Sequence, residues 1–138
     1  MTRGIRVAIA VITLTGCAAC GGSVATPTPV ANGDWGGDRI AMAVASAATH
    51  IELDCAHGDV PAPLATDTRG QFSAAGTFVR EHGGPIRDDD ATNARPATYA
   101  GTIRSNQMSL SIRLADSGEL VGTFTLTFGA RGRIVKCL

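Results

Sequence analysis

The chain is 138 residues long, and its twelve basic and twelve acidic residues give a formal net charge of zero at pH 7. The basic residues form no cluster along the sequence, and binding to nucleic-acid phosphates depends on such clusters. Nucleic acid is therefore not an expected partner. The length suits a single domain.

The N-terminus has the features of an export signal. Arg3 and Arg6 precede an apolar run over residues 7–12, and residues 14–17 read Leu-Thr-Gly-Cys. A short positive region followed by a short apolar one is typical of a secretory signal. The run is also shorter than the about 20 residues that a membrane-spanning helix needs. The last four residues resemble the lipobox of bacterial lipoproteins.

This resemblance implies that residues 1–16 are a lipoprotein signal peptide and that Cys17 receives diacylglycerol. The mature protein is then exported and held to a membrane of the cell envelope, and two or more acyl chains make such anchoring stable. The alternative is ordinary secretion with cleavage near Ala19, which gives a soluble protein. Loss of Arg3 and Arg6 leaves ten basic residues against twelve acidic ones.

Residues 17–32 are predicted to be a flexible tether between the lipid and the folded domain. They consist almost entirely of Gly, Ala, Ser, Thr, Val and Pro. A segment without large side chains cannot bury enough apolar surface to fold on its own. One domain remains, over residues 33–138.

Two of the four cysteines are expected to form a disulfide. Lipidation occupies Cys17, and Cys20 lies beside it in the tether, which leaves Cys55 and Cys137 in the domain. An oxidising envelope compartment permits their pairing. The alternatives are two free buried thiols, or a metal site that also uses His57.

Period-two alternation of apolar and polar residues dominates the domain and predicts strands with one buried face. In chain order, the predicted strands are residues 40–48, 49–55, 71–80, 98–104, 108–114, 121–128 and 132–138. Residues 40–48 are rich in alanine, and helical propensity alone would also allow a helix there. Turn-forming residues separate the runs at 58–59, 68–70, 105–106, 116–118 and 130–132, and residues 81–97 are expected to form a surface loop.

The expected fold class is all-β, a small antiparallel up-and-down barrel of about seven or eight strands. Short loops between consecutive strands favour an antiparallel meander, and closure into a barrel removes the exposed edges of the sheet. A β-sandwich is the alternative.

Gly33 and Trp35 resemble the Gly-x-Trp of lipocalins and of related calycin-like barrels such as avidin. In those folds the tryptophan plugs one end of the barrel, and an arginine from the last strand packs over it. The resemblance implies that Arg131 or Arg133 has this role here. The alternative is a tryptophan that only begins a core strand.

Two groups of residues have side chains suited to chemistry. His50, Glu52 and Asp54 alternate along one predicted strand, so they form a weak candidate metal or acid–base site; the alternative is the solvated outer face of an amphipathic strand. Asp88, Asp89 and Asp90 offer oxygen ligands but lack the spacing of a dedicated calcium loop, which favours a charged loop tip. No catalytic motif occurs, and no catalytic residue, resident metal or cofactor is predicted.

The sequence therefore favours an envelope lipoprotein that acts as a binding or interaction module without catalytic activity. Its expected partners are the membrane, through the lipid anchor, and a small apolar ligand or another envelope protein. One alternative is a metal-assisted enzyme that uses His50, Glu52 and Asp54. The other is a structural envelope protein whose barrel is filled by its own side chains.

Overall fold

The computed structural model describes residue 22 and residues 24–85 and 93–137. The predicted leader, the lipidation site Cys17, Cys20 and the loop residues Asp88–Asp90 lie outside the described residues. Among the residues described, no helix has the length and hydropathy needed to cross a lipid bilayer.

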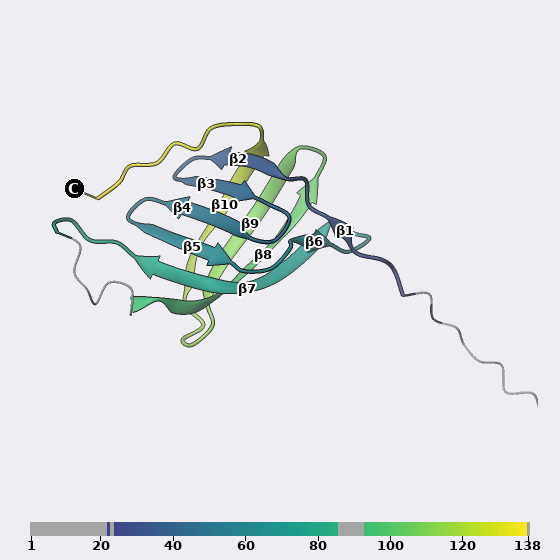
Figure 1. The fold of residues 1–138 in the computed structure, drawn as a ribbon, viewed down its shortest axis with the longest axis horizontal. Coiled ribbons are helices and arrows are strands. Elements are labelled where there is room, and N and C mark those ends of the chain that lie inside the picture. The colour runs from purple at the N-terminus through teal and green to yellow at the C-terminus, as the bar shows by residue number, and fades with distance from the viewer. Residues whose placement is uncertain (1–21, 23, 86–92, 138) are drawn as a thin grey trace, which may run out of the picture.

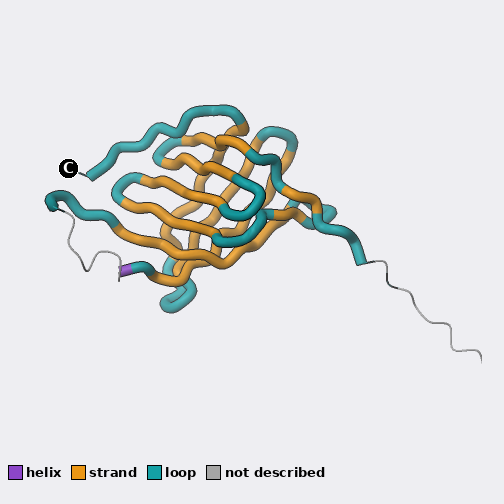
Figure 2. The backbone as a smooth tube through the Cα atoms, viewed as in Figure 1, coloured by secondary structure: helices purple, strands orange, loops and turns teal. Residues whose placement is uncertain are grey.

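Eight antiparallel strands form a closed barrel, which confirms the predicted fold class (Figures 1 and 2). They are β2 (Gly33–Gly37), β3 (Ile40–Val44), β4 (Thr49–Leu53), β5 (Ala56–Val60), β7 (Gln71–Arg80), β8 (Arg95–Arg104), β9 (Gln107–Leu114) and β10 (Leu120–Phe128). Consecutive barrel strands are neighbours, and β10 pairs with β2 to close the sheet. Two short strands outside the barrel, β1 (Thr28–Pro29) and β6 (Ala65–Thr66), pair with each other.

The alternation seen in the sequence places one face of each strand in the core. In β9, Met108, Leu110, Ile112 and Leu114 are all fully buried. The segment 40–44 also alternates and forms β3 rather than a helix. Packing of alternate residues on the sheet therefore outweighs the helical propensity of its alanines.

Several predicted local features are wrong. The predicted strand 40–48 ends at Val44, β8 begins at Arg95 inside the predicted loop 81–97, and β2 and β5 are not among the predicted strands. Residues 58–59 do not form a turn but lie within β5, and the turn falls at Asp54–Cys55 instead. Residues 132–137 form no barrel strand, and they contribute only an isolated bridge between Arg133 and Asp38. Gly58 is found in a strand because a side chain at this position would collide with the Tyr99 hydroxyl.

Side chains fill the middle of the barrel. Tyr99 is fully buried, and its Oη donates a hydrogen bond to the Thr77 carbonyl oxygen at 2.6 Å. A Cβ atom on Gly58 would lie 1.8 Å from this Oη, and one on Gly76 would lie 3.0 Å from the Tyr99 ring. These glycines make the space that the tyrosine occupies. The surrounding core contains Phe72, Phe78, Ile51, Met108, Leu110, Ile112 and Leu126.

One end of the barrel, which we call the closed end, is covered by β1, β6 and the residues next to them. Val30 and Leu64 are buried there, and Val30 N donates to Leu64 O at 2.9 Å. Packing thus begins at Thr28, inside the segment that the sequence assigned to the tether. The N-terminal chain leaves the barrel at this end (Figure 1).

Trp35 is also buried at the closed end, where its ring packs edge-on against Phe128 with centroids 5.1 Å apart. Gly33 has a φ of 136°, and a Cβ there would press on the Phe128 ring at 3.1 Å. The expected arginine cover is not formed by Arg133, whose side chain is 87% exposed and faces Asp38 at 3.8 Å. Phe128 packs on the tryptophan, and Arg131, the other expected cover, is exposed.

The C-terminal segment runs back along the outer side of β2 and β3 to the opposite end of the barrel (Figure 1). Arg133 N donates to Gly37 O at 2.9 Å, and Arg39 N donates to Arg133 O at 2.7 Å. The segment ends in the predicted disulfide between Cys55 and Cys137, whose Cα atoms are 5.0 Å apart. The disulfide joins the chain's C-terminal segment to the β4–β5 turn rather than to a last barrel strand.

Candidate functional site

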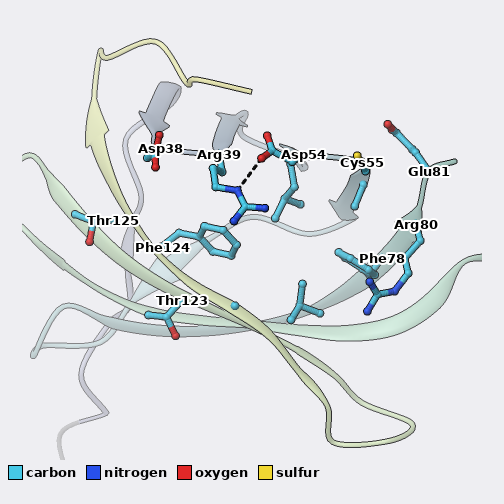
Figure 3. A pocket seen from close by; sticks show the side chains of 14 residues that line it. Asp38, Arg39, Asp54, Cys55, Phe78, Arg80, Glu81, Thr123, Phe124 and Thr125 are labelled. Atoms are coloured by element: carbon cyan, nitrogen blue, oxygen red, sulfur yellow. Dashed lines mark hydrogen bonds and ion pairs between the residues drawn. The ribbon is translucent and has the colours of Figure 1, made fainter. Parts of the chain in front are cut away.

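The end of the barrel opposite the closed end, which we call the mouth, contains an open cleft of about 680 Å³ (Figure 3). The β2–β3 turn, the β4–β5 turn, the end of β7 and the start of β10 surround it. Its lining residues are Asp38, Arg39, Leu53, Asp54, Cys55, Ala56, Phe78, Arg80, Glu81 and residues 121–125.

The floor of the cleft is apolar. Leu53 and Phe78 are nearly fully buried, whereas Val121 and Phe124 are partly exposed and pack on the core. The Phe124 ring lies towards the middle of the cleft (Figure 3). A Cβ on Gly122 would lie 2.8 Å from this ring, so the glycine at the irregularity between Leu120 and Gly122 gives Phe124 its position.

The rim of the cleft is charged. Arg39 Nε donates to Asp54 Oδ2 at 2.7 Å, and Arg80 Nη2 donates to Glu119 Oε1 at 2.8 Å. Asp54 Oδ1 also accepts a hydrogen bond from Val135 N at 2.7 Å. The bonds from the Val135 amide and from Arg39 lower the pKa of Asp54, so this carboxylate is ionised at neutral pH.

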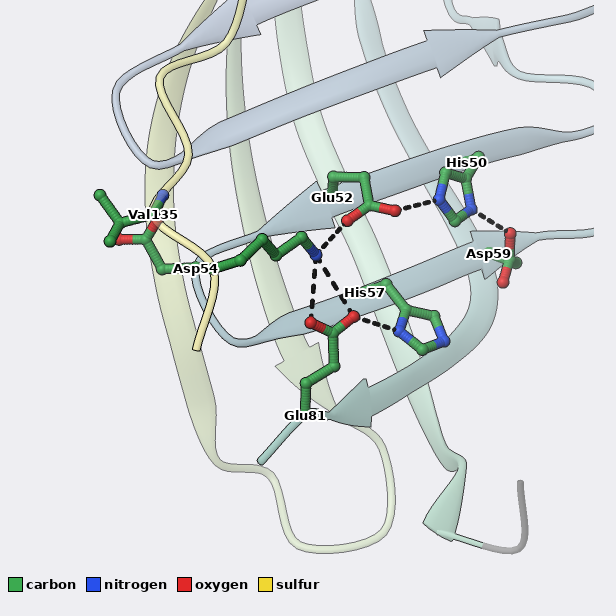
Figure 4. A network of polar contacts seen from close by, with 8 residues as sticks. His50, Glu52, Asp54, His57, Asp59, Glu81 and Val135 are labelled. Carbon is green, nitrogen blue, oxygen red and sulfur yellow. Dashed lines mark hydrogen bonds and ion pairs between the residues drawn. The ribbon is translucent and has the colours of Figure 1, made fainter. Parts of the chain in front are cut away.

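A second group of polar residues lies on the outer face of the barrel, and we call it the outer-face network (Figure 4). It consists of His50, Glu52, His57, Asp59, Glu81 and Lys136. His50 contacts Asp59 and Glu52 at 2.7 Å each, and His57 contacts Glu81 at 2.8 Å. Lys136 bridges Glu52 and Glu81.

The network attaches the C-terminal segment to the barrel wall through charge. Burial alone would raise the pKa of Glu52, but hydrogen bonds from Lys136 and His50 outweigh burial and lower it. Burial would likewise raise the pKa of Glu81, but hydrogen bonds from His57 and Lys136 outweigh burial and lower it. Glu52, Glu81 and Lys136 therefore stabilise one another in their charged forms.

The three residues of the predicted metal or acid–base row do not converge. His50 and Glu52 belong to the outer-face network, whereas Asp54 lies in the β4–β5 turn and binds Arg39 and Val135 N. Within residues 24–85 and 93–137, no group of three or more His, Cys, Asp and Glu side chains is arranged to hold a metal ion. The row breaks because the strand ends at Leu53 and the chain turns.

Asp54 and Cys55 were singled out from the sequence for other roles, whereas Arg39, Arg80 and Phe124 were not predicted to line a site. Arg39 follows Gly36-Gly37-Asp38 and adopts a φ of 64°, a conformation that favours glycine or asparagine. Arg39 lies with Asp38 in the turn that follows Gly37, the last residue of β2. No local sequence pattern indicated that Glu81 and Lys136 belong to the outer-face network, because their partners are distant in the sequence.

Comparison with protein-family models, with curated proteins and with solved structures finds no match to this chain.

The outer-face network predicts a pH dependence of stability. Hydrogen bonds to Asp59 and Glu52 raise the pKa of His50 above its ordinary value of 6.5. A raised pKa in the folded state gives stability that is complete below the unfolded pKa and is lost as the pH rises through the folded one. We expect the free energy of unfolding to fall between about pH 6 and pH 8 by less than about 1 kcal/mol, because these groups are partly exposed.

Urea unfolding of the His50→Gln variant across this range checks the effect, since the variant should show a flatter profile than the natural sequence. Asp59→Asn removes the main partner of His50 and should flatten the profile in the same way. Identical pH profiles for all three proteins would contradict the assignment.

Proposed function

We propose that this protein is an exported, lipid-anchored binding module that takes a small amphipathic molecule in the mouth of its barrel. The observation that carries the proposal is an apolar floor beneath a charged rim, at the one barrel end that β1 and β6 leave uncovered among the described residues. No catalytic step is part of the proposal.

The size and lining of the cleft support a small-molecule ligand. Its volume of about 680 Å³ falls within the range of about 300 to 1,000 Å³ that is usual for such sites. Phe124 and Val121 offer apolar contact that is not fully used by the core. Ligand sites of this kind combine apolar surface with a few polar groups that orient the ligand.

The filled middle of the barrel limits where a ligand can lie. Tyr99 and the core around it occupy the space that would be the ligand cavity of a larger barrel. A small apolar ligand deep inside the barrel is therefore not part of the proposal. The ligand rests in the mouth, with its apolar part on Phe124.

The position of the mouth suits a lipid-anchored protein. We infer from the lipobox that residues 1–16 are removed and that lipid on Cys17 holds the protein to a membrane. The tether joins the barrel at the closed end, and the mouth is at the other end (Figure 1). Attachment at the closed end leaves the mouth clear of the anchor, where a ligand has access.

A neutral fluorescent probe tests the binding site. N-phenyl-1-naphthylamine becomes bright in apolar surroundings, and we expect it to bind the natural sequence. Phe124→Ala should weaken its binding about tenfold, because the aromatic contact at the floor is lost.

Phe128→Ala is the matched control, since Phe128 is a partly exposed aromatic residue of the same strand at the closed end. It should leave the affinity of the probe unchanged. Weaker binding in Phe128→Ala with unchanged binding in Phe124→Ala would move the site to the other end and contradict the proposal.

The anchor has its own test. Cys17→Ser removes the sulfur that accepts diacylglycerol, so we expect the variant to leave the membrane fraction of the expressing bacterium. Cys20→Ser, three residues further on, should remain membrane-bound. Unchanged membrane attachment of Cys17→Ser would contradict lipidation at this residue.

A further inference from the structure

The rim residue Arg39 has a backbone conformation that its side chain does not favour. It lies in the turn between β2 and β3 with a φ of 64°. For a residue with a Cβ this region costs about 1 kcal/mol or more. Such conformations occur often at functional sites, where a particular side chain is needed.

Most of the hydrogen-bonding capacity of Arg39 is unused. Its Nε donates to Asp54, and its two terminal nitrogens make no hydrogen bond to any described residue. The side chain is 68% exposed, and its guanidinium lies over Phe124 within the cleft (Figure 3). The terminal nitrogens therefore present parallel N–H donors above the apolar floor.

Asp54 fixes the direction of this guanidinium. One of its oxygens accepts from Val135 N and the other from Arg39 Nε. The Val135 amide is itself held close by the disulfide two residues further on, which connects Cys137 to Cys55. Asp54 thus has a constrained position and holds Arg39 by the Nε edge, which leaves the terminal nitrogens for a ligand.

Three other charged residues line the cleft, and they differ in whether their charged groups face it. Arg80 extends towards the cleft, with its guanidinium carbon 5.7 Å from the centre of the Phe78 ring. The Glu81 carboxylate instead joins the outer-face network, and the Asp38 carboxylate faces Arg133 outside the barrel. Guanidinium groups therefore face the cleft, while these two carboxylates have partners elsewhere.

We propose that the ligand of the mouth is a monoanionic amphiphile, whose carboxylate or sulfonate is bound by the terminal nitrogens of Arg39 while its apolar part contacts Phe124. A planar guanidinium matches such an oxyanion with two parallel hydrogen bonds. Arg80, which is paired with Glu119 at 2.8 Å, lies at the other side of the floor. This inference rests on the proposed function, because it specifies the ligand of the same cleft.

A matched pair of probes tests the inference. 8-Anilinonaphthalene-1-sulfonate has the same aromatic body as N-phenyl-1-naphthylamine with a sulfonate added. At low ionic strength we expect the sulfonate probe to bind about tenfold more tightly, as charge-assisted hydrogen bonds add to the apolar contact. Salt should reduce this preference.

Arg39→Gln should abolish the preference for the sulfonate probe, measured as the ratio of the affinities of the two probes, and its urea unfolding curve shows whether the variant is folded. Arg39→Lys keeps the charge without the paired donors and should retain only part of the preference. Arg104→Gln is the matched control, because Arg104 is an exposed arginine at the closed-end terminus of β8.

The outcomes separate the two proposals. Equal affinities for both probes, with no effect of Arg39→Gln, would overturn the anionic ligand and leave the binding site in place. An equal loss of preference in Arg39→Gln and Arg104→Gln would also overturn it, since the effect would then be one of overall charge. If neither probe responds to Phe124→Ala, the mouth is not the binding site and the proposed function itself fails.

Discussion

The packing of Tyr99 in the middle of the barrel is the constraint on which the rest of the structure depends. Its ring needs the space left by Gly58 and Gly76, and its hydroxyl is satisfied by the Thr77 carbonyl. Burial, with the charge of Asp59, raises the pKa of this tyrosine, so the phenol stays neutral in its site. The barrel is consequently solid at mid-height, and any binding must use its ends or its outer face.

The two ends differ because different parts of the chain reach them. β1, β6 and Trp35 cover one end, and the C-terminal segment reaches the other end along the outer wall. The disulfide and the outer-face network fix that segment next to the β4–β5 turn. It supplies the Val135 amide that holds Asp54, and Asp54 in turn orients Arg39 above Phe124. A segment without barrel pairing thus contributes to the site.

The barrel could be predicted because alternation is a local signal: β9 and β10 each show it in their own residues. The disulfide followed from counting the cysteines that remained. Gly58 could not be placed from its neighbours in the sequence, since a glycine in a strand and a glycine in a turn look alike until the facing Tyr99 is known. The mouth could not be predicted, because Arg39, Arg80 and Phe124 come together only when the barrel closes.

The central claim is that ligand binds at the mouth because the middle of the barrel is filled. Amide chemical shifts of ¹⁵N-labelled protein, recorded during titration with N-phenyl-1-naphthylamine, test it most directly. We predict that the shifts concentrate at Leu53 and at residues 121–125, with Ile103 and Phe128 at the closed end unchanged. Shifts centred on Tyr99 and its neighbours, or on the closed end, would contradict the account.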